Sequence, residues 1–270
     1  MNDDKYFETN LRRWNELVDI NAKAKSYDLE GFKSGKLSLF PIEIEELGNV
    51  KGKSLLHLQC HFGMDTLSWA RLGANVTGVD FSDKAINYAK CLSSELNIPA
   101  RFIHANLYDI PNILTEKFDI VFTSYGTICW LPDLVKWAQI ISNSLKSGGV
   151  FYIIDGHPFG FIVDDKQKPF KVGFNYFSEG KPVYFDEGGA YADLSAELKN
   201  QASYQWDHPI SDIINAIINA NLIIEFLHEF PFTFFSIHPN MKRREDGYWE
   251  FENYKFSIPM MFSIRAHKKF

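Results

Sequence analysis

The stretch from Ser54 to Gly63, SLLHLQCHFG, decides the fold of this chain. Its first half is a short apolar run that follows a Lys51-Gly52-Lys53 turn, as expected for a buried strand. A helical pattern begins directly after Gly63, with apolar residues at Met64, Leu67, Ala70 and Leu72. A strand that passes through a tight glycine turn into a helix is the first unit of an open parallel sheet. Ligands of such sheets bind at this turn, next to the helix N-terminus.

Strands and helices alternate over the following hundred or so residues. Further strand patterns cover residues 74–80, 101–104, 118–124 and 150–154. Helical patterns cover residues 82–97 and 134–145, and a later helix at 210–221 precedes strand patterns at 222–230 and 258–268. This alternation predicts βαβ units and an α/β fold, a mostly parallel sheet with helices on both faces. We predict one elaborated domain over residues 1–270.

Two segments depart from this alternation. Residues 1–50 hold an amphipathic helical pattern at 4–26 and a short helical pattern at 42–47, so we predict a helical lid there. Residues 156–208 contain 11 aromatic residues, and polar and apolar residues alternate over 201–206. Such alternation is typical of a half-exposed strand. We therefore predict an inserted, β-rich, aromatic cap, which either shapes a substrate pocket or only covers the sheet.

An acid ends the second predicted strand. This residue, Asp80, lies 17 residues after Gly63. A carboxylate at this position of an open parallel sheet can accept hydrogen bonds from the hydroxyls of a ribose. The two features together predict a site for a nucleoside-containing cofactor between the first two strands.

These residues resemble the class I S-adenosylmethionine-dependent methyltransferases. The first motif of that family reads acid-x-Gly-x-Gly-x-Gly, whereas residues 57–63 keep only the last glycine. Asp80, residues 105–108 and residues 145–149 resemble later family signatures in the same order. The resemblance implies an enzyme that uses S-adenosyl-L-methionine. It also implies a Rossmann-like sheet of seven strands in the order 3-2-1-4-5-7-6, with strand seven antiparallel.

The resemblance further implies which residues hold the methionine end of the cofactor. Gly63 would allow close approach of the backbone, and the turn formed by Gln59, Cys60 and His61 would hold the methionine group. N-terminal helices cover the cofactor in this family, so Tyr27 is a candidate lid residue.

The resemblance also implies which residues hold the adenosine end of the cofactor. Asp80, followed by Phe81, would accept the ribose hydroxyls. Asn106 and Leu107 lie where the family contacts adenine, and the Asn106 amide oxygen could accept from the adenine amino group. The alternative for Asn106 is a simple turn residue. Ser124, at the end of the fourth strand, would face the sulfonium.

Three other readings of the first turn remain open. A nicotinamide-dependent oxidoreductase needs glycines so that the backbone can approach a pyrophosphate, and Gln59 and His61 would crowd that group. A non-catalytic protein that binds S-adenosylmethionine or S-adenosylhomocysteine would tolerate the altered motif. A strand–turn–helix unit that binds no ligand is the plainest alternative.

The residues after the fourth strand favour a small-molecule acceptor. Methylases of amide or nucleobase nitrogens often carry Asn/Asp-Pro-Pro-aromatic there, whereas this chain has Ser124-Tyr125-Gly126-Thr127. We predict Tyr125, His157 and His208 as the catalytic residues, because the two histidines border the aromatic cap. An unperturbed histidine titrates near ~6.5, which suits a general base. The alternative is that these histidines only form structural hydrogen bonds.

The composition of the chain argues against several classes of protein. The net charge of −6 disfavours nucleic-acid binding, which usually needs a basic face. No apolar run approaches the ~20 residues of a membrane span, and residues 1–5 lack a signal-peptide pattern. Three separated cysteines indicate neither a disulfide framework nor a zinc site, and no histidine, cysteine and aspartate spacing indicates another metal. We therefore expect a cytoplasmic protein without a metal.

Overall fold

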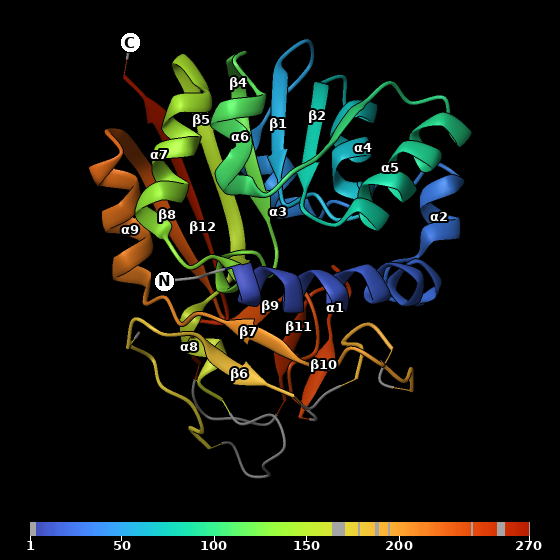
Figure 1. Ribbon diagram of the computed structural model, residues 1–270, viewed down its shortest axis with the longest axis vertical. Coiled ribbons are helices and arrows are strands. Elements are labelled where there is room, and N and C mark those ends of the chain that lie inside the picture. The colour runs from blue at the N-terminus through green and yellow to red at the C-terminus, as the bar shows by residue number, and fades with distance from the viewer. Residues whose placement is uncertain are drawn as a thin grey trace.

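A seven-stranded sheet forms the centre of the molecule (Figure 1), in the order β3-β2-β1-β4-β5-β12-β8. The computed structural model describes residues 4–163, 171–177, 179–186, 189–193, 195–238, 240–252 and 257–269. The strands are β1 (Ser54–Leu58), β2 (Asn75–Asp80), β3 (Arg101–His104), β4 (Phe118–Ser124), β5 (Leu145–Gly156), β8 (Leu222–Phe230) and β12 (Met261–Lys268). Strand β12 is antiparallel to both β5 and β8. The predicted strand order and the antiparallel last strand are therefore confirmed.

Side chains alternate across the sheet and build a separate core on each face. On one face, residues such as Leu56, Val121 and Ile153 pack beneath α6 (Ile110–Ile113), α7 (Leu134–Ser144) and α9 (Ile210–Asn219). On the other face, Leu55, Phe122 and Tyr152 pack with Trp69 of α4 (Met64–Arg71) and with α3 (Pro41–Leu47). Helix α5 (Asp83–Glu95) continues this second layer over β2 and β3. Helices therefore cover both faces, as predicted.

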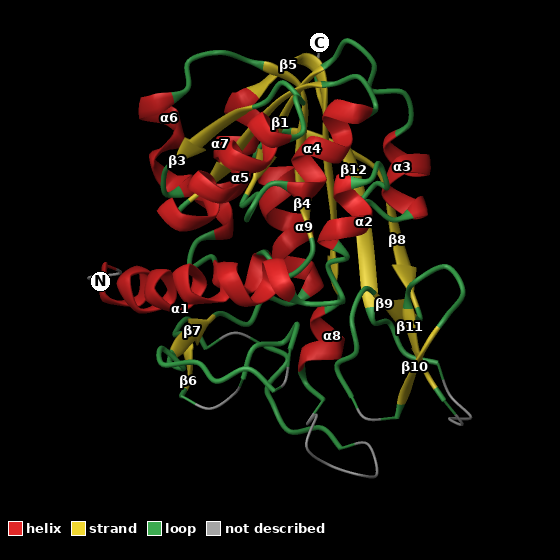
Figure 2. Cartoon of the chain, turned by 90° about the vertical axis from the view of Figure 1, so that its right-hand side faces the viewer, coloured by secondary structure: helices red, strands yellow, loops and turns green. Residues whose placement is uncertain are grey.

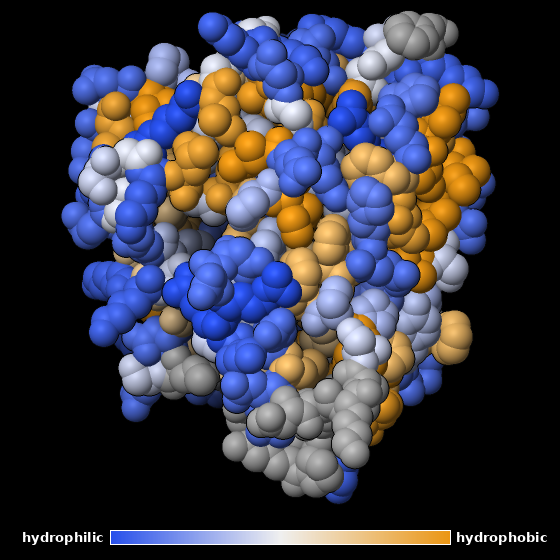
Figure 3. Space-filling view, turned by 180° about the vertical axis from the view of Figure 1, so that it is seen from behind, coloured by the Kyte–Doolittle hydropathy of each residue, from blue (hydrophilic) through white to orange (hydrophobic). Residues whose placement is uncertain are grey.

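The edge of the sheet at β8 carries exposed apolar groups. Seen from behind (Figure 3), apolar surface gathers along this side of the molecule. Ile218 of α9 and Ile223 of β8 are among the exposed large apolar side chains. Charged or polar residues such as Glu225 and His228 alternate with the apolar ones along β8. Such interruptions are typical of an edge strand that does not pair with another chain.

Helix α1 (Asp4–Lys23) lies across the carboxyl ends of the parallel strands (Figure 1). The Asn15 side chain accepts from the Ser82 hydroxyl at 2.6 Å and donates to Asp83 at 2.9 Å, just after β2. The predicted helix over 4–26 ends three residues earlier, and a short helix α2 (Leu29–Lys33) follows. Within the described part of the chain, no helix combines the length and the hydrophobicity that crossing a bilayer requires.

The described part of residues 156–208 forms a layer on the far side of α1 from the sheet (Figures 1 and 2). Helix α8 (Pro158–Phe161) opens it, and β6 (Val183–Phe185) pairs antiparallel with β7 (Ser203–Gln205), which fits the predicted half-exposed strand at 201–206. Predicted cap residues 164–170, including Phe170, and residues 178, 187, 188 and 194 lie outside the described residues. We refer to the described part of 156–208 as the cap.

A second small sheet, absent from the expectations above, stands beside the cap. Its strands are β9 (Phe232–Thr233), β10 (Met241–Arg243) and β11 (Trp249–Phe251), in the order β10-β11-β9 (Figure 2). Strands of two or three residues are too short to show a period of two in the sequence. Tyr248, directly before β11, stacks on Phe40 at the amino end of α3, and Phe232 of β9 packs against Tyr248.

Candidate cofactor and active site

The turn between β1 and α4 keeps a glycine-like backbone although two of its three glycine positions carry side chains. Gln59 and His61 have φ of 56° and 51°, and Gly63 has φ of 85°. The left-handed conformation costs a residue with a side chain roughly 1–2 kcal/mol. The chain therefore retains the loop shape of the family motif, and the Gln59 and His61 side chains are added to the space beside it.

Asp80 fixes this turn. Its Oδ2 accepts from the His61 backbone amide at 2.8 Å, and its Oδ1 accepts from the Ser82 amide at 2.8 Å. The residue is 7% exposed, and burial raises the pKa of its carboxyl to about 6 although the backbone amides favour the charged form. Each carboxylate oxygen can accept a second hydrogen bond. Besides these amides the carboxylate can accept further hydrogen bonds at the end of β2, as the hydroxyls of a ribose would require.

Gly63 is required by packing. A Cβ at this position would lie 2.8 Å from both the Ala89 Cβ and the Phe102 ring. The glycine therefore allows α5 and β3 to pack against the turn, a role known for the last glycine of such motifs. That its backbone also approaches a cofactor stays a prediction.

His57 occupies the position of the first acid in the family motif. Its Nδ1 lies 2.8 Å from the Thr66 hydroxyl, and its Nε2 lies 3.3 Å from the Ser124 hydroxyl. Ser124 also donates to Asp65 at 3.2 Å. Burial lowers the pKa of His57 to about 3, so the ring is neutral near pH 7. This network holds Ser124 at the carboxyl end of β4, but sequence reasoning identified only Ser124 in it.

Asp155, which sequence reasoning missed, shapes the loop after β4. Its carboxylate accepts from the backbone amides of Thr127 at 3.0 Å, Ile128 at 3.1 Å and Gly156 at 2.7 Å, and also from Gly126. The residue is buried, and burial raises its pKa. An acid directly after the apolar run Val150–Ile154 was the available signal. The loop that begins at Tyr125 is therefore held as firmly as the turn after β1.

The Tyr125 hydroxyl is engaged on the α3 side of the sheet. It donates to Glu43 Oε2 at 2.6 Å, while Glu43 Oε1 accepts from the Phe40 amide at 2.7 Å. Glu43 is fully buried, and this burial raises its pKa to about 8. The Tyr125 ring packs 4.5 Å from the Phe234 ring. The structure thus shows a structural role for this hydroxyl, and its predicted role in catalysis stays a prediction.

The two predicted catalytic histidines also have protein partners. His157 Nδ1 accepts from the Phe159 amide at 3.0 Å, which caps α8, and its Nε2 lies 2.9 Å from Glu229. His208 Nε2 donates to the Leu131 carbonyl at 2.6 Å. Because a carbonyl only accepts, the neutral His208 ring has Nδ1 as its acceptor, which is unpaired within the described residues. His208 lines a surface groove of about 540 Å³ between α7, α9 and the cap.

The predicted adenine contacts lie where expected in the chain, directly after β3. The Asn106 side chain accepts from the Tyr108 amide at 3.0 Å, so it caps the turn at Leu107–Asp109. Leu107 is buried in the core beneath α7. Phe81 accepts through its backbone oxygen from His104 at 3.0 Å. The turn role considered for Asn106 is therefore present, and the oxygen retains a second lone pair for a ligand.

Aromatic side chains close the space between this edge and α1. The Trp14 ring lies 5.4 Å from the His61 ring and 5.3 Å from the Trp130 ring. The Tyr27 hydroxyl is hydrogen-bonded to the Tyr191 hydroxyl of the cap. In the same turn, the Cys60 thiol is buried, which raises its pKa well above the usual range. Tyr27 thus lies beside the turn, as a lid residue would.

Comparison with known proteins shows similarity to methyltransferases. Residues 56–153 match a family described as a methyltransferase domain. An uncharacterized methyltransferase from Synechocystis is 31% identical over 125 residues, covering 46% of this chain and 56% of the relative. A ubiquinone biosynthesis O-methyltransferase from Proteus mirabilis is 28% identical over 131 residues, covering 47% and 53%. The chain spans about half the length of the curated relatives it matches.

Solved structures share the fold over most of the chain. An S-adenosylmethionine-dependent methyltransferase from Mesorhizobium loti has a TM-score of 0.59 at 18% identity, covering 87% of this chain and 100% of its own. A counterpart from Listeria monocytogenes has a TM-score of 0.56 at 18% identity, covering 84% and 98%. The chain therefore has the fold of the class I S-adenosylmethionine-dependent methyltransferases, and its residues 56–153 match a methyltransferase domain.

Proposed function

We propose that this protein transfers a methyl group from S-adenosyl-L-methionine to a small-molecule acceptor. The position of Asp80 carries the proposal. Its carboxylate is held at the end of β2 by the backbone amides of His61 and Ser82, and its oxygens can accept further hydrogen bonds from ribose hydroxyls. Burying a carboxylate with unused acceptor capacity is costly, and hydrogen bonds from a ligand would offset that cost.

The residues around Asp80 fit the remaining parts of the cofactor. Phe81 and Leu107 lie at the ends of β2 and β3, where the adenosine would sit, and Asn106 offers an amide oxygen to adenine. At the other end, Cys60 and Gly63 belong to the turn proposed for the methionine group. Ser124, fixed by His57 and Asp65, lies at the end of β4, next to the expected sulfonium.

Bound S-adenosylmethionine supplies a methyl group on a positively charged sulfur with a neutral leaving group. The protein has to align the acceptor with the methyl–sulfur bond, and such orientation can supply roughly 7–11 kcal/mol of the barrier. The loops fixed by Asp80 and Asp155 give rigid positions for this alignment. Helix α1 and the cap lie over the same edge, so they would exclude water from the reacting groups (Figure 1).

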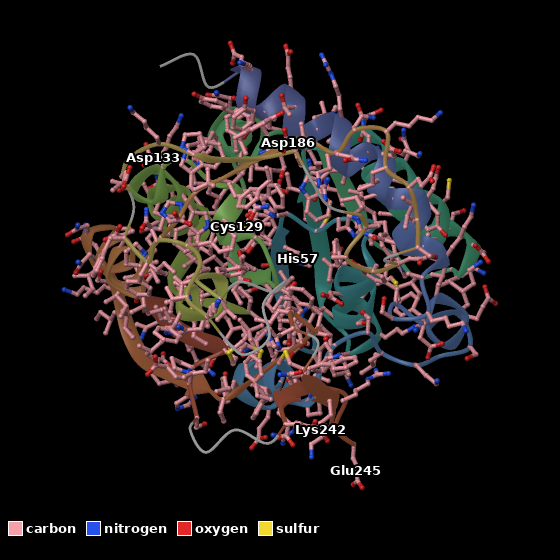
Figure 4. The ribbon with its side chains drawn as sticks, turned by 90° about the horizontal axis from the view of Figure 1, so that it is seen from below. His57, Cys129, Asp133, Asp186, Lys242 and Glu245 are labelled. Carbon is pink, nitrogen blue, oxygen red and sulfur yellow. The ribbon has the colours of Figure 1, made fainter. Side chains whose placement is uncertain are left out.

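The groove beside the cap is the proposed entry for the acceptor. Tyr6, Val135 and Trp206 give it apolar walls, and His208 and Asp212 give it polar groups, a combination usual in small-molecule sites. Seen from below (Figure 4), Cys129 lies between Asp133 at this groove and His57 at the end of β1. The Trp206 amide at the groove donates to the Cys129 carbonyl at 2.8 Å, so the groove borders the loop after β4.

His208 is the proposed general base for an acceptor that loses a proton. Its Nδ1 is free to accept, and burial lowers the pKa of the ring, so the neutral form predominates near pH 7. Tyr125 and His157 remain proposed catalytic residues on sequence grounds alone. By name, the curated relatives include O-methyltransferases, and structural neighbours include a geranyl diphosphate C-methyltransferase and a glycopeptide N-methyltransferase. We therefore propose only a small-molecule acceptor, without assigning the atom.

The experiment that tests this function measures release of S-adenosylhomocysteine from S-adenosylmethionine in the presence of a panel of phenols, amines and prenyl diphosphates. We expect acceptor-dependent release by the wild-type protein and its loss in Asp80→Ala. Binding of the cofactor without release on any acceptor would favour the non-catalytic alternative. The free thiols of Cys60, Cys91 and Cys129 are consistent with the cytoplasmic location that we propose.

A further inference from the structure

Asn21, near the end of α1, has a polar atom without a partner. The residue is completely buried. Its Nδ2 donates to the Tyr191 hydroxyl at 2.9 Å and lies 3.5 Å from His61 Nε2, while its Oδ1 has no hydrogen-bond partner among the described residues. If the amide is turned over, the oxygen can accept from Tyr191 and the nitrogen is left without a full partner. An unpaired buried polar atom costs roughly 1–3 kcal/mol, so this arrangement needs an explanation.

Gln59 presents a second unpaired amide oxygen. Its Nε2 donates to the Thr127 carbonyl at 3.1 Å, and its buried Oε1 accepts no hydrogen bond from the part of the chain that the structure describes. The orientation of this amide is fixed, because two oxygens facing each other at that distance would repel. Gln59 also holds a left-handed backbone at a position where the family motif has glycine. The position of this oxygen therefore carries two energetic costs, the missing hydrogen bond and the left-handed backbone.

The two amides flank the same turn. His61 connects them, because Asn21 Nδ2 lies 3.5 Å from His61 Nε2 and Gln59 lies two residues before His61 in the turn. The backbone amide of His61 is bonded to Asp80, the proposed ribose ligand. In the sheet, β1 lies between β2 and β4, so the turn lies where the strand order reverses and ligands of such folds bind.

The surroundings of the two amides determine which ligand group they suit. Trp14, Tyr27, Trp130 and Tyr191 are uncharged, and burial lowers the pKa of His61 to about 3, so that ring is neutral as well. Carbonyl oxygens accept, so the ligand group must donate at more than one point. An ammonium carries three N–H donors, and amide oxygens can accept charge-assisted hydrogen bonds from it.

We propose that Asn21 and Gln59 bind the α-ammonium of the cofactor's amino-acid end, so that α1 takes part directly in cofactor recognition. This inference rests on the proposed function. It also links the cofactor to the cap, because Asn21 donates to the Tyr191 hydroxyl. Farther along α1, Asn10 also contacts the cap, and its amide donates to and accepts from the backbone of Tyr204 in β7, both at 2.8 Å.

The test compares two ligands that differ in the amino-acid end alone. S-Adenosylhomocysteine carries the ammonium, whereas methylthioadenosine has the same adenosine and sulfur without it. Calorimetry would give both dissociation constants for the wild-type protein, for Asn21→Leu and for Gln59→Met. We expect each variant to bind S-adenosylhomocysteine about 10- to 100-fold more weakly, as for loss of a hydrogen bond to a charged group, with methylthioadenosine affected less than threefold.

Asn10→Leu is the matched control, since it removes an equally buried amide of α1 whose two polar atoms are both paired. It should lower the melting temperature without changing the ratio of the two constants. Asn21→Leu should leave the ligand-free melting temperature unchanged or higher, because it removes an unpaired group. If Asn21→Leu does not fold, the two dissociation constants of Gln59→Met test the inference.

Two results would overturn the inference, and they differ in what else they overturn. If the wild-type protein binds S-adenosylhomocysteine and both folded variants keep the wild-type ratio of constants, the ammonium site is wrong and the proposed function stands. If the wild-type protein binds neither ligand, the proposed function fails and this inference fails with it.

Discussion

The backbone amide of His61 donates a 2.8 Å hydrogen bond to the Asp80 carboxylate. This bond joins the turn after β1 to the end of β2, and it forms where His61 has the left-handed φ of 51°. One buried carboxylate therefore holds a strained turn in place and also offers acceptors to a ligand. The altered first motif remains compatible with the family's cofactor because this bond preserves the shape that glycines provide elsewhere.

Asp80→Ala should weaken binding of S-adenosylhomocysteine about tenfold to more than a hundredfold, since each hydrogen bond to a charged group contributes roughly 1.5–3 kcal/mol. The melting temperature should fall as well, because the His61 and Ser82 amides lose their acceptor. Asp119→Ala is the control, because this acid pairs with Ser54 at the start of β1. Calorimetry on both variants checks the prediction, and equal affinities would remove Asp80 from the site.

Gly63→Ala should destabilise the protein far more than Gly126→Ala. Both glycines have positive φ, at 85° and 74°, so both variants carry left-handed strain. Only at Gly63 would the new Cβ clash, 2.8 Å from Ala89 and Phe102, whereas nothing lies within 4 Å at Gly126. Overpacking adds about 1–3 kcal/mol. Urea unfolding of the two variants gives the difference, and a smaller loss for Gly63→Ala would show that α5 and β3 adjust freely.

The sheet could be predicted from the sequence because its strands are continuous apolar runs bounded by turn residues. The pattern at residues 222–230 coincides with β8, and the family resemblance supplied the antiparallel place of β12. The small sheet β9–β11 could not be predicted, since its strands are two or three residues long and pair across loops. Local pattern carries no information about such pairing.

Only some of the site residues could be predicted, because many of their hydrogen bonds join distant parts of the chain. Asp80 stands out because an acid ends an apolar strand. The bonds of Glu43 to Tyr125 and of Asn21 to Tyr191 join residues 82 and 170 positions apart in the chain. Which partner a polar side chain finds at that separation depends on the tertiary fold. The sequence therefore identified Tyr125 but not the buried acid that holds its hydroxyl.

Glu43→Gln should make the protein less sensitive to rising pH. The folded-state pKa of Glu43 is raised to about 8, from an ordinary value of 4.5, by burial. Between these two values the unfolded chain has lost the proton while the folded chain keeps it, so stability falls as the pH rises. A glutamine cannot titrate and removes this contribution.

Thermal unfolding between pH 5 and pH 8 checks this prediction. The melting temperature of Glu43→Gln, relative to wild type, should increase steadily across that interval. Glu45→Gln is the control, because Glu45 is exposed on the same helix. A difference between Glu43→Gln and wild type that stays constant with pH would show that Glu43 does not hold a proton in the folded protein.

His208→Gln should reduce turnover while leaving the affinity for S-adenosylhomocysteine unchanged, because the proposed base acts on the acceptor through Nδ1. His157→Gln serves as the comparison. His157 caps α8 and pairs with Glu229, so its loss should lower the melting temperature. Steady-state kinetics and calorimetry on both variants separate these effects. Full turnover in His208→Gln would exclude this residue as the base.

The central claim is that the edge formed by Asp80 and the turn after β1 binds S-adenosylmethionine, and direct calorimetric titration tests it. Wild-type protein should bind S-adenosylmethionine and S-adenosylhomocysteine at one site per chain, and Asp80→Ala should weaken both. NAD should not bind, because Gln59 and His61 occupy the space that a pyrophosphate needs. Binding of NAD, or no binding of either sulfur ligand by the folded wild-type protein, would contradict the account.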